Sequence, residues 1–81
     1  MVGYDESLRV TCELLRRQVP ETREIHAADD IQSDLGLDSL SVMELVADIE
    51  TRFGINIPAD VFGKIVTVAD VARAVTKLGS R

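Results

Sequence analysis

The sequence predicts an all-α fold, a small four-helix bundle with three main helices, one short helix and a long loop after the first helix. Three observations support this prediction. The 81 residues suffice for one small domain, residues 1–81, without a second core. Apolar residues recur at helical spacing in several stretches. Cys12 is the only cysteine, so packed helices rather than disulfide bonds must stabilise so short a chain.

The first helix is predicted over about residues 5–18. Pro20 ends it, because proline disfavours a helical residue before it. Cys12 is then a small buried side chain of the core. The apolar residues of this stretch recur at spacings of four, three and four, so they share one helical face: Leu8, Cys12, Leu15 and Val19.

The stretch from Glu21 to about Asp34 has no helical period, and we expect a long loop that crosses the bundle. Ile25 and Ile31 are its isolated apolar anchors. We expect a solvated acidic loop without a metal site, and weak Mg²⁺ or Ca²⁺ binding is the less favoured alternative. The aspartates of this region do not have the spacing of an EF-hand loop: Asp29, Asp30, Asp34 and Asp38.

The strongest helical pattern runs from about Ser39 to Phe53, with Asp38 placed to cap its start and Gly54 to end it. Winding these residues at roughly 100° each gives two apolar stripes. The first must be the buried face: Val42, Leu45, Val46, Ile49 and Phe53. The second lies on another side, next to Ser39, and Glu44 and Glu50 flank it: Leu40, Met43 and Ala47.

A helix needs only one apolar stripe to join a bundle, so the second stripe requires another explanation. We expect a docking surface with an apolar centre and an acidic rim, in which the flexible Met43 side chain adapts to several partners. The alternative is that the long loop covers the stripe. Ser39 lies at the mouth of this surface, where the N–H groups and dipole of a helix start favour a nearby phosphate.

The last third of the chain contains a short helix and a longer one. Pro58 suits the first position of a short helix over about residues 59–62, which Gly63 closes. Thr67 caps the fourth helix, with Asp70 completing a variant of the capping box. The apolar face of this helix is Val68, Val71, Ala72, Val75 and Leu78.

The formal net charge of −5 argues against a nucleic-acid partner, because affinity for phosphate backbones depends on Lys and Arg. It favours partner proteins with basic patches. We see no signal peptide and no apolar segment long enough to span a bilayer. We therefore expect a cytoplasmic monomer.

A resemblance to a known family begins with the order Asp-Leu-Gly-Leu-Asp-Ser-Leu over residues 34–40. Together with Glu44-Leu45-Val46, this run resembles the phosphopantetheine attachment region of acyl carrier proteins. The first helix agrees with the family only in pattern, whereas from about Asp30 onward the match covers nearly the whole chain. It continues through Glu50, Phe53, Ile57-Pro58, Lys64-Ile65, Thr67-Val68 and Val71.

The resemblance implies that Ser39 is modified with 4′-phosphopantetheine. A phosphopantetheinyl transferase would use Mg²⁺ to activate coenzyme A, and the Ser39 hydroxyl would attack its β-phosphate and release 3′,5′-ADP. The thiol of the arm would carry acyl groups as thioesters between a ketosynthase, an acyltransferase or similar enzymes. Asp38 would help the transferase to recognise the chain. The residues that match the family's docking positions are Leu40, Met43, Glu44 and Glu50, and Ala47 completes the apolar stripe.

The second helix has fewer carboxylates than is typical of fatty-acid carriers, with Ser41, Thr51 and Arg52 at or near commonly acidic positions. Gly36-Leu37-Asp38 also differs from the Gly-Gly-His or Gly-Gly-Asp of peptidyl carriers. We therefore favour a carrier of polyketide biosynthesis, with primary fatty-acid synthesis or an aminoacyl carrier as alternatives.

Two other functions are weighed against the carrier. An enzyme with Ser39 as nucleophile would need a base, and His26 is the only histidine. It lies in the irregular loop, where a solvated or packed role is the simpler interpretation, so we do not expect an enzyme. An acidic helical adaptor would explain the two stripes but would leave the Ser39 motif without a use.

Overall fold

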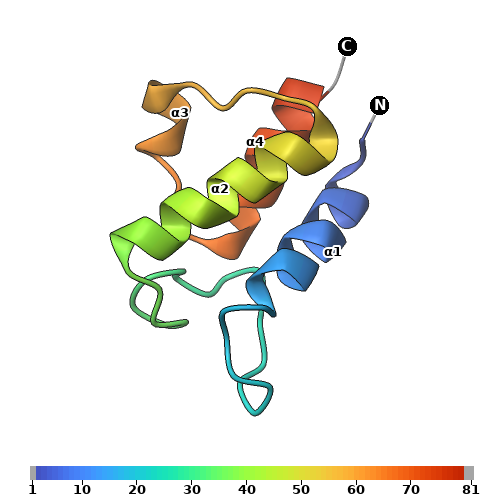
Figure 1. Cartoon of the computed structure of the whole chain (residues 1–81). Helices are drawn as coiled ribbons and strands as arrows, with labels where there is room; N and C mark the ends of the chain where they lie inside the picture. The colour runs from blue at the N-terminus through green and yellow to red at the C-terminus, as the bar shows by residue number, and fades with distance from the viewer. Residues whose placement is uncertain (1, 80–81) are drawn as a thin grey trace.

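The computed structural model describes residues 2–79, in which four helices form a small bundle (Figure 1). They are α1 (Tyr4–Leu15), α2 (Ser39–Phe53), α3 (Ala59–Phe62) and α4 (Val68–Gly79). The all-α prediction of three main helices and one short helix is confirmed. Over the described residues, no helix is long and apolar enough to cross a membrane.

Helix α1 ends at Leu15, earlier than the predicted end near residue 18. The reason is a change in backbone hydrogen bonding after Leu15. The N–H groups of Arg17 and Gln18 donate to carbonyls three residues back, at 3.3 and 2.9 Å, which tightens the chain into turns. The tighter turns still bring Val19 into the core, where it is 4% exposed.

The face that α1 buries differs in part from the predicted one. Leu15 and Val19 are buried as expected, but Leu8 and Cys12 are half-buried at the edge. Burial raises the pKa of the Cys12 thiol. The centre of the face also contains two small polar residues whose hydroxyls bond within the helix. Ser7 Oγ donates to the Gly3 carbonyl at 2.9 Å and Thr11 Oγ1 to the Ser7 carbonyl at 2.7 Å.

Helix α4 packs mainly against α1, and α2 packs against both. The predicted apolar face of α4 is confirmed except that Leu78 is only half-buried. Ala69 and Ala74 are buried as well. The first and last described residues also meet. A methyl group on Gly79 would lie 3.6 Å from Cγ2 of Val2, and Figure 1 shows the two ends of the described residues close together.

The predicted long loop is present and joins α1 to α2. Its backbone bonds to the segment that leads into α4: Ile31 N–H donates to the Val66 carbonyl at 2.9 Å, and Val68 N–H to the Asp29 carbonyl at 3.1 Å. Ile31 is fully buried and Ile25 half-buried, as predicted for the anchors. The loop is therefore an ordered part of the bundle.

The loop carboxylates accept hydrogen bonds from nearby backbone N–H groups. Asp29 accepts from His26 at 2.7 Å, and Asp34 accepts from Asp30 at 2.7 Å. Backbone hydrogen bonding, from His26 and from Ser33 respectively, lowers the pKa values of Asp29 and Asp30. Within residues 2–79, no group of three His, Cys, Asp or Glu side chains is arranged to bind a metal ion.

The predicted caps explain where the other helices begin and end. Gly54 ends α2 in the left-handed conformation, with φ of 66°. Pro58 precedes α3 as its N-cap residue, one position before the predicted one. At the start of α4, Thr67 N–H donates to Asp70 at 2.9 Å and Asp70 N–H donates to Thr67 Oγ1 at 3.1 Å, which completes the predicted capping box.

Candidate functional site

Ser39 is the first residue of α2, and it is exposed. Asp38 caps the helix: its Oδ1 accepts the N–H of Ser41 at 2.8 Å. This hydrogen bond lowers the pKa of Asp38, so the carboxylate is ionised beside Ser39 at neutral pH. The cap also sets the direction in which the chain enters α2. A local sequence signal thus places the Ser39 hydroxyl at a helix start and open to solvent.

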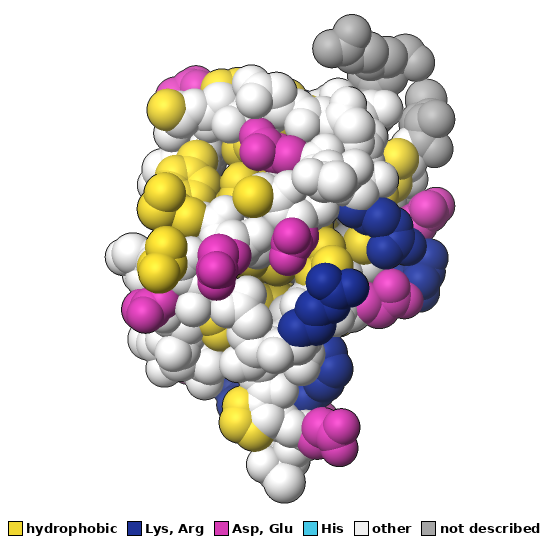
Figure 2. All heavy atoms as spheres, viewed as in Figure 1, with side chains coloured by type: hydrophobic (Ala, Val, Ile, Leu, Met, Phe, Trp, Pro, Cys, Tyr) yellow, Lys and Arg dark blue, Asp and Glu magenta, His cyan; other side chains and the backbone are white. Residues whose placement is uncertain are grey.

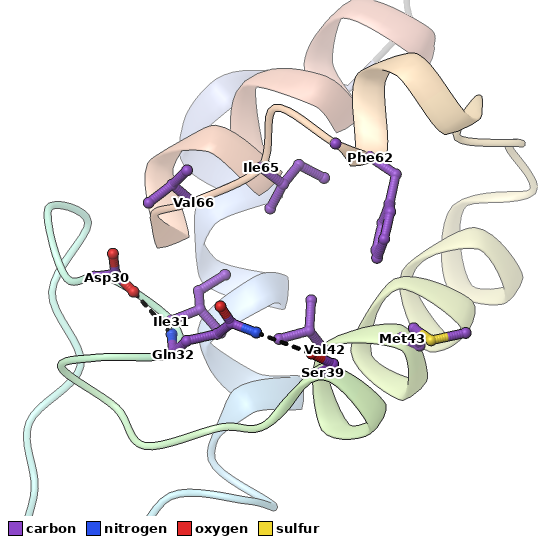
Figure 3. Close-up of a pocket in the computed structure, with 10 residues that line it drawn as sticks. Asp30, Ile31, Gln32, Ser39, Val42, Met43, Phe62, Ile65 and Val66 are labelled. Atoms are coloured by element: carbon purple, nitrogen blue, oxygen red, sulfur yellow. Dashed lines mark hydrogen bonds between the residues drawn. The ribbon is translucent and has the colours of Figure 1, made fainter.

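A side chain of the long loop forms a hydrogen bond with the Ser39 hydroxyl. Gln32 Nε2 donates to Ser39 Oγ over 3.5 Å, a contact marked in Figure 3. The sequence did not predict this contact. Gln32 follows the buried Ile31 and belongs to no periodic pattern, so only the folded loop brings it to the start of α2.

A cleft of about 260 Å³ opens beside Ser39, between the start of α2, the loop and the segment that follows α3. Figure 3 shows side chains from these three parts of the chain around the opening. Its polar side chains, Asp30, Gln32 and Ser39, come from the loop and the start of α2, and its other lining side chains are apolar. The lining residues are Asp30, Ile31, Gln32, Ser39, Val42, Met43, Phe62, Gly63, Ile65 and Val66.

The second apolar stripe of α2 is open to solvent. Leu40 is 66% exposed and Met43 57%, so the alternative in which the long loop covers the stripe is wrong. Ala47 is exposed as well, and Val66 across the cleft is 51% exposed. Figure 2 shows hydrophobic side chains gathered on this face of the molecule, with acidic side chains beside them. The arrangement is an apolar centre next to Ser39.

The two glutamates expected at the rim differ in their surroundings. Glu44 is exposed, and no ion pair is found for it within the described part of the chain. Glu50 is half-buried, and its Oε2 accepts the N–H of Ile57 at 2.8 Å. Glu50 therefore also joins α2 to the segment before α3, which the sequence did not predict. Whether Glu50 contacts a partner stays a prediction.

His26 does not form a nucleophile–base pair with Ser39. Its ring Nε2 lies 3.1 Å from the carboxylate of Glu24, and both side chains are largely exposed. The hydroxyl of Ser39 instead contacts the amide of Gln32, which is not a base. The geometry therefore offers an accessible serine at a helix start, and His26 does not activate it.

Comparisons with known proteins agree with this geometry. A family model described as "Phosphopantetheine attachment site" matches residues 8–75. An acyl carrier protein of Prochlorococcus marinus (strain MIT 9515) is 35% identical over 73 residues, which cover 89% of this chain and 91% of the relative. One of Wolinella succinogenes is 40% identical over 73 residues, covering 90% and 92%.

A solved structure is similar as well. The solution structure of MacpD, an acyl carrier protein from Pseudomonas fluorescens involved in mupirocin biosynthesis, aligns with a TM-score of 0.69 and 30% sequence identity. The alignment covers 96% of this chain and 71% of that chain. The likeness thus extends to the arrangement of the helices.

Proposed function

Because the chain belongs to the phosphopantetheine-binding family of acyl carrier proteins, we propose that Ser39 is the residue that bears its 4′-phosphopantetheine group. Members of this family carry acyl groups and are not enzymes themselves. They work with a phosphopantetheinyl transferase and with acyl-processing enzymes. The match over residues 8–75 supports the interpretation of residues 1–81 as one carrier domain.

The observation that supports Ser39 most directly is its exposed hydroxyl at the start of α2. A phosphodiester at this position stays in solvent and lies near the positive end of the helix dipole. In the proposed modification, Ser39 Oγ forms a bond to the β-phosphorus of coenzyme A and 3′,5′-ADP leaves. The hydroxyl proton passes to a base of the transferase or to solvent. When attached, the group supplies a thiol that forms thioesters with acyl groups.

We also propose that the open stripe of α2 is the surface to which partner enzymes dock. Leu40, Met43 and Ala47 form an apolar centre that is already exposed, and exposed apolar patches of this kind mark interaction sites. Glu44 gives the rim a negative charge that attracts basic partners. Asp38, next to Ser39, is the residue proposed for recognition by the transferase. Glu50 is part of the proposed docking surface and also has a structural role, because its carboxylate accepts the N–H of Ile57.

Intact-mass spectrometry tests the modification. The purified chain is incubated with coenzyme A, Mg²⁺ and a promiscuous phosphopantetheinyl transferase, alongside Ser39→Ala and the matched control Ser41→Ala. We expect the wild type and Ser41→Ala to gain the mass of one phosphopantetheine and Ser39→Ala to gain none. No gain on the folded wild type, also with a cognate transferase, would favour the adaptor function instead.

For the pathway, we propose polyketide biosynthesis. Two observations support it: α2 has Ser41, Thr51 and Arg52 at or near positions that are commonly acidic in fatty-acid carriers, and the similar MacpD is involved in mupirocin biosynthesis. Primary fatty-acid synthesis and an aminoacyl carrier are the alternatives. The test is the mass of the acyl group on holo protein isolated from its source cells. A chain that retains keto groups from more than one condensation, or an α-branched chain, would support the polyketide proposal, whereas saturated straight chains or an amino acid would contradict it.

A further inference from the structure

The cleft beside Ser39 offers few side-chain hydrogen-bond donors. Of the ten described residues that line it, only Gln32 and Ser39 have a side-chain N–H or O–H group. Asp30 is the single charged residue among them, and its carboxylate cannot donate when ionised. A negatively charged group on Ser39 would therefore find one side-chain donor in this cleft, the amide of Gln32.

The turn that carries Gln32 is fixed on both sides. The backbone N–H of Gln32 donates to Asp30 Oδ1 at 2.9 Å, and the backbone carbonyl of Gln32 accepts the N–H of Gly36 at 3.0 Å. Ile31, just before it, is 2% exposed and bonds through its N–H to the Val66 carbonyl. The backbone therefore fixes the position from which the Gln32 side chain extends, and the side-chain amide reaches Ser39 although the residue is exposed (Figure 3).

We propose that the side-chain amide of Gln32 is the hydrogen-bond donor that positions the phosphodiester on Ser39. This rests on the modification of Ser39 proposed above. The present contact of 3.5 Å to Ser39 Oγ is long for a hydrogen bond. A phosphate attached to Ser39 Oγ places its own oxygens farther out than Oγ. These oxygens therefore come closer to the Gln32 amide, which is slightly too distant from Oγ itself for a good hydrogen bond. Hydrogen bonds to ionised acceptors are also shorter and stronger than neutral ones.

The surrounding charges make a neutral donor useful at this position. Asp38 and Asp30 are the carboxylates next to the site, and both already accept backbone N–H groups. Because both are negative, they repel a phosphate rather than bind it. The Gln32 amide offsets part of this repulsion without a charge of its own. The same hydrogen bond would link the phosphate, which is the first group of the phosphopantetheine arm, to the loop. The arm would then be held at Gln32 as well as at Ser39.

Nuclear magnetic resonance of the ¹⁵N-labelled full chain tests the contact directly. The side-chain amides are those of Gln18, Gln32 and Asn56, and the Gln32 pair is identified by its loss in Gln32→Ala. We expect the Gln32 pair to shift when the chain is converted from the apo to the holo form. The Asn56 pair, beyond the far end of α2, should keep its position. Intact mass confirms that the sample is fully loaded.

The ³¹P resonance of the holo protein gives a second readout. We expect it to move in Gln32→Asn, whose shorter side chain withdraws the donor, and to return toward the wild-type position in Gln32→Arg, which restores one. Asn56→Ala, which removes a side-chain amide beyond the far end of α2, is the control and should leave the resonance in place. Circular dichroism confirms that each variant keeps its helices.

The possible outcomes separate this proposal from the modification itself. A Gln32 amide pair and a ³¹P resonance that both stay unchanged, on fully loaded protein, would overturn the role of Gln32 and leave Ser39 as the attachment residue. A wild-type chain that gains no mass would contradict the modification of Ser39, and the role of Gln32 would fall with it.

Discussion

The carboxylate of Glu50 in the last turns of α2 accepts the backbone N–H of Ile57 at 2.8 Å. This hydrogen bond crosses the turn after α2 and secures the extended segment that leads to α3. Ile57 is 7% exposed and belongs to the core, so the bond also fixes the backbone position from which this side chain packs into the core. A residue expected on the docking rim is thus part of the internal structure of the bundle.

Replacing Glu50 separates these two roles. Glu50→Ala removes the acceptor and should lower the free energy of unfolding by about 1–2 kcal/mol, because the N–H of Ile57 loses its partner. Glu50→Gln keeps an acceptor oxygen, so it should cost less. Urea denaturation measures both, with the exposed Glu44→Ala as the control. Equal stability of Glu50→Ala and the wild type would show that the bond contributes nothing.

The end of α2 depends on the left-handed conformation of Gly54. Gly54→Ala should lower the free energy of unfolding by about 1 kcal/mol, because a side chain is strained at φ of 66°. Gly63→Ala is the matched control, since Gly63 has the ordinary φ of −66° and an added Cβ would make only a normal contact, at 3.5 Å. Thermal or urea unfolding of both variants measures the difference. A Gly54→Ala protein as stable as Gly63→Ala would contradict the strain argument.

The capping box at α4 should also contribute to stability. The Asp70 carboxylate accepts the N–H groups of Val66 and Thr67, each at 2.9 Å. Asp70→Ala removes both bonds, and we expect a loss of about 1–2 kcal/mol in the free energy of unfolding. The exposed ion pair of Asp70 with Arg73 adds little to this figure. Asp48→Ala, an exposed aspartate in the middle of α2, should change the unfolding free energy far less.

Acid should destabilise the fold through the same carboxylates. The backbone N–H of Thr67 lowers the pKa of Asp70, and that of Ser41 lowers the pKa of Asp38. A group with a lowered folded pKa stabilises the fold above its unfolded pKa, and this contribution disappears as the pH falls through the folded value. The free energy of unfolding should therefore fall as the pH drops below about 4, the ordinary pKa of aspartate. Urea titrations at several pH values measure this, and Asp70→Asn should show a smaller fall than the wild type.

Reversing the charge of Glu44 tests the docking surface. Glu44→Lys places a positive charge beside the apolar centre of α2, so we expect slower acyl transfer to partner enzymes with an unchanged circular-dichroism spectrum. Glu21→Lys makes the same charge change on the loop, away from α2, and should leave the rates close to the wild type. Transfer rates on fully loaded protein provide the measurement. If both variants transfer at the wild-type rate, the rim has no role in docking.

The sequence predicted most reliably those features that depend on neighbouring residues. Asp38 and Gly54 bracket α2, and the helix runs from Ser39 to Phe53 as expected because its caps are local signals. The existence of a second apolar stripe followed from helical geometry alone. Whether the long loop covers it was decided only by the fold, in which Leu40 and Met43 are exposed.

Features that depend on side-chain hydrogen bonds, rather than on the spacing of apolar residues, were missed. The buried face of α1 includes Ser7 and Thr11, which hydropathy assigns to the surface, because their hydroxyls bond to carbonyls of the preceding turn. Glu50 and Gln32 have their partners at Ile57 and Ser39, seven residues away in each case. Neither pair lies within one periodic element, so no spacing rule brings its members together.

The meeting of Val2 and Gly79 has a practical consequence for how the protein can be handled. Figure 1 shows the ends of the described chain on one side of the molecule and the start of α2, with Ser39, on the opposite side. An affinity tag, a fluorescent protein or a surface tether could therefore be fused at either end without shielding the serine. A sensor chip loaded through the amino end and one loaded through the carboxyl end should present the same face to a partner in the flowing solution.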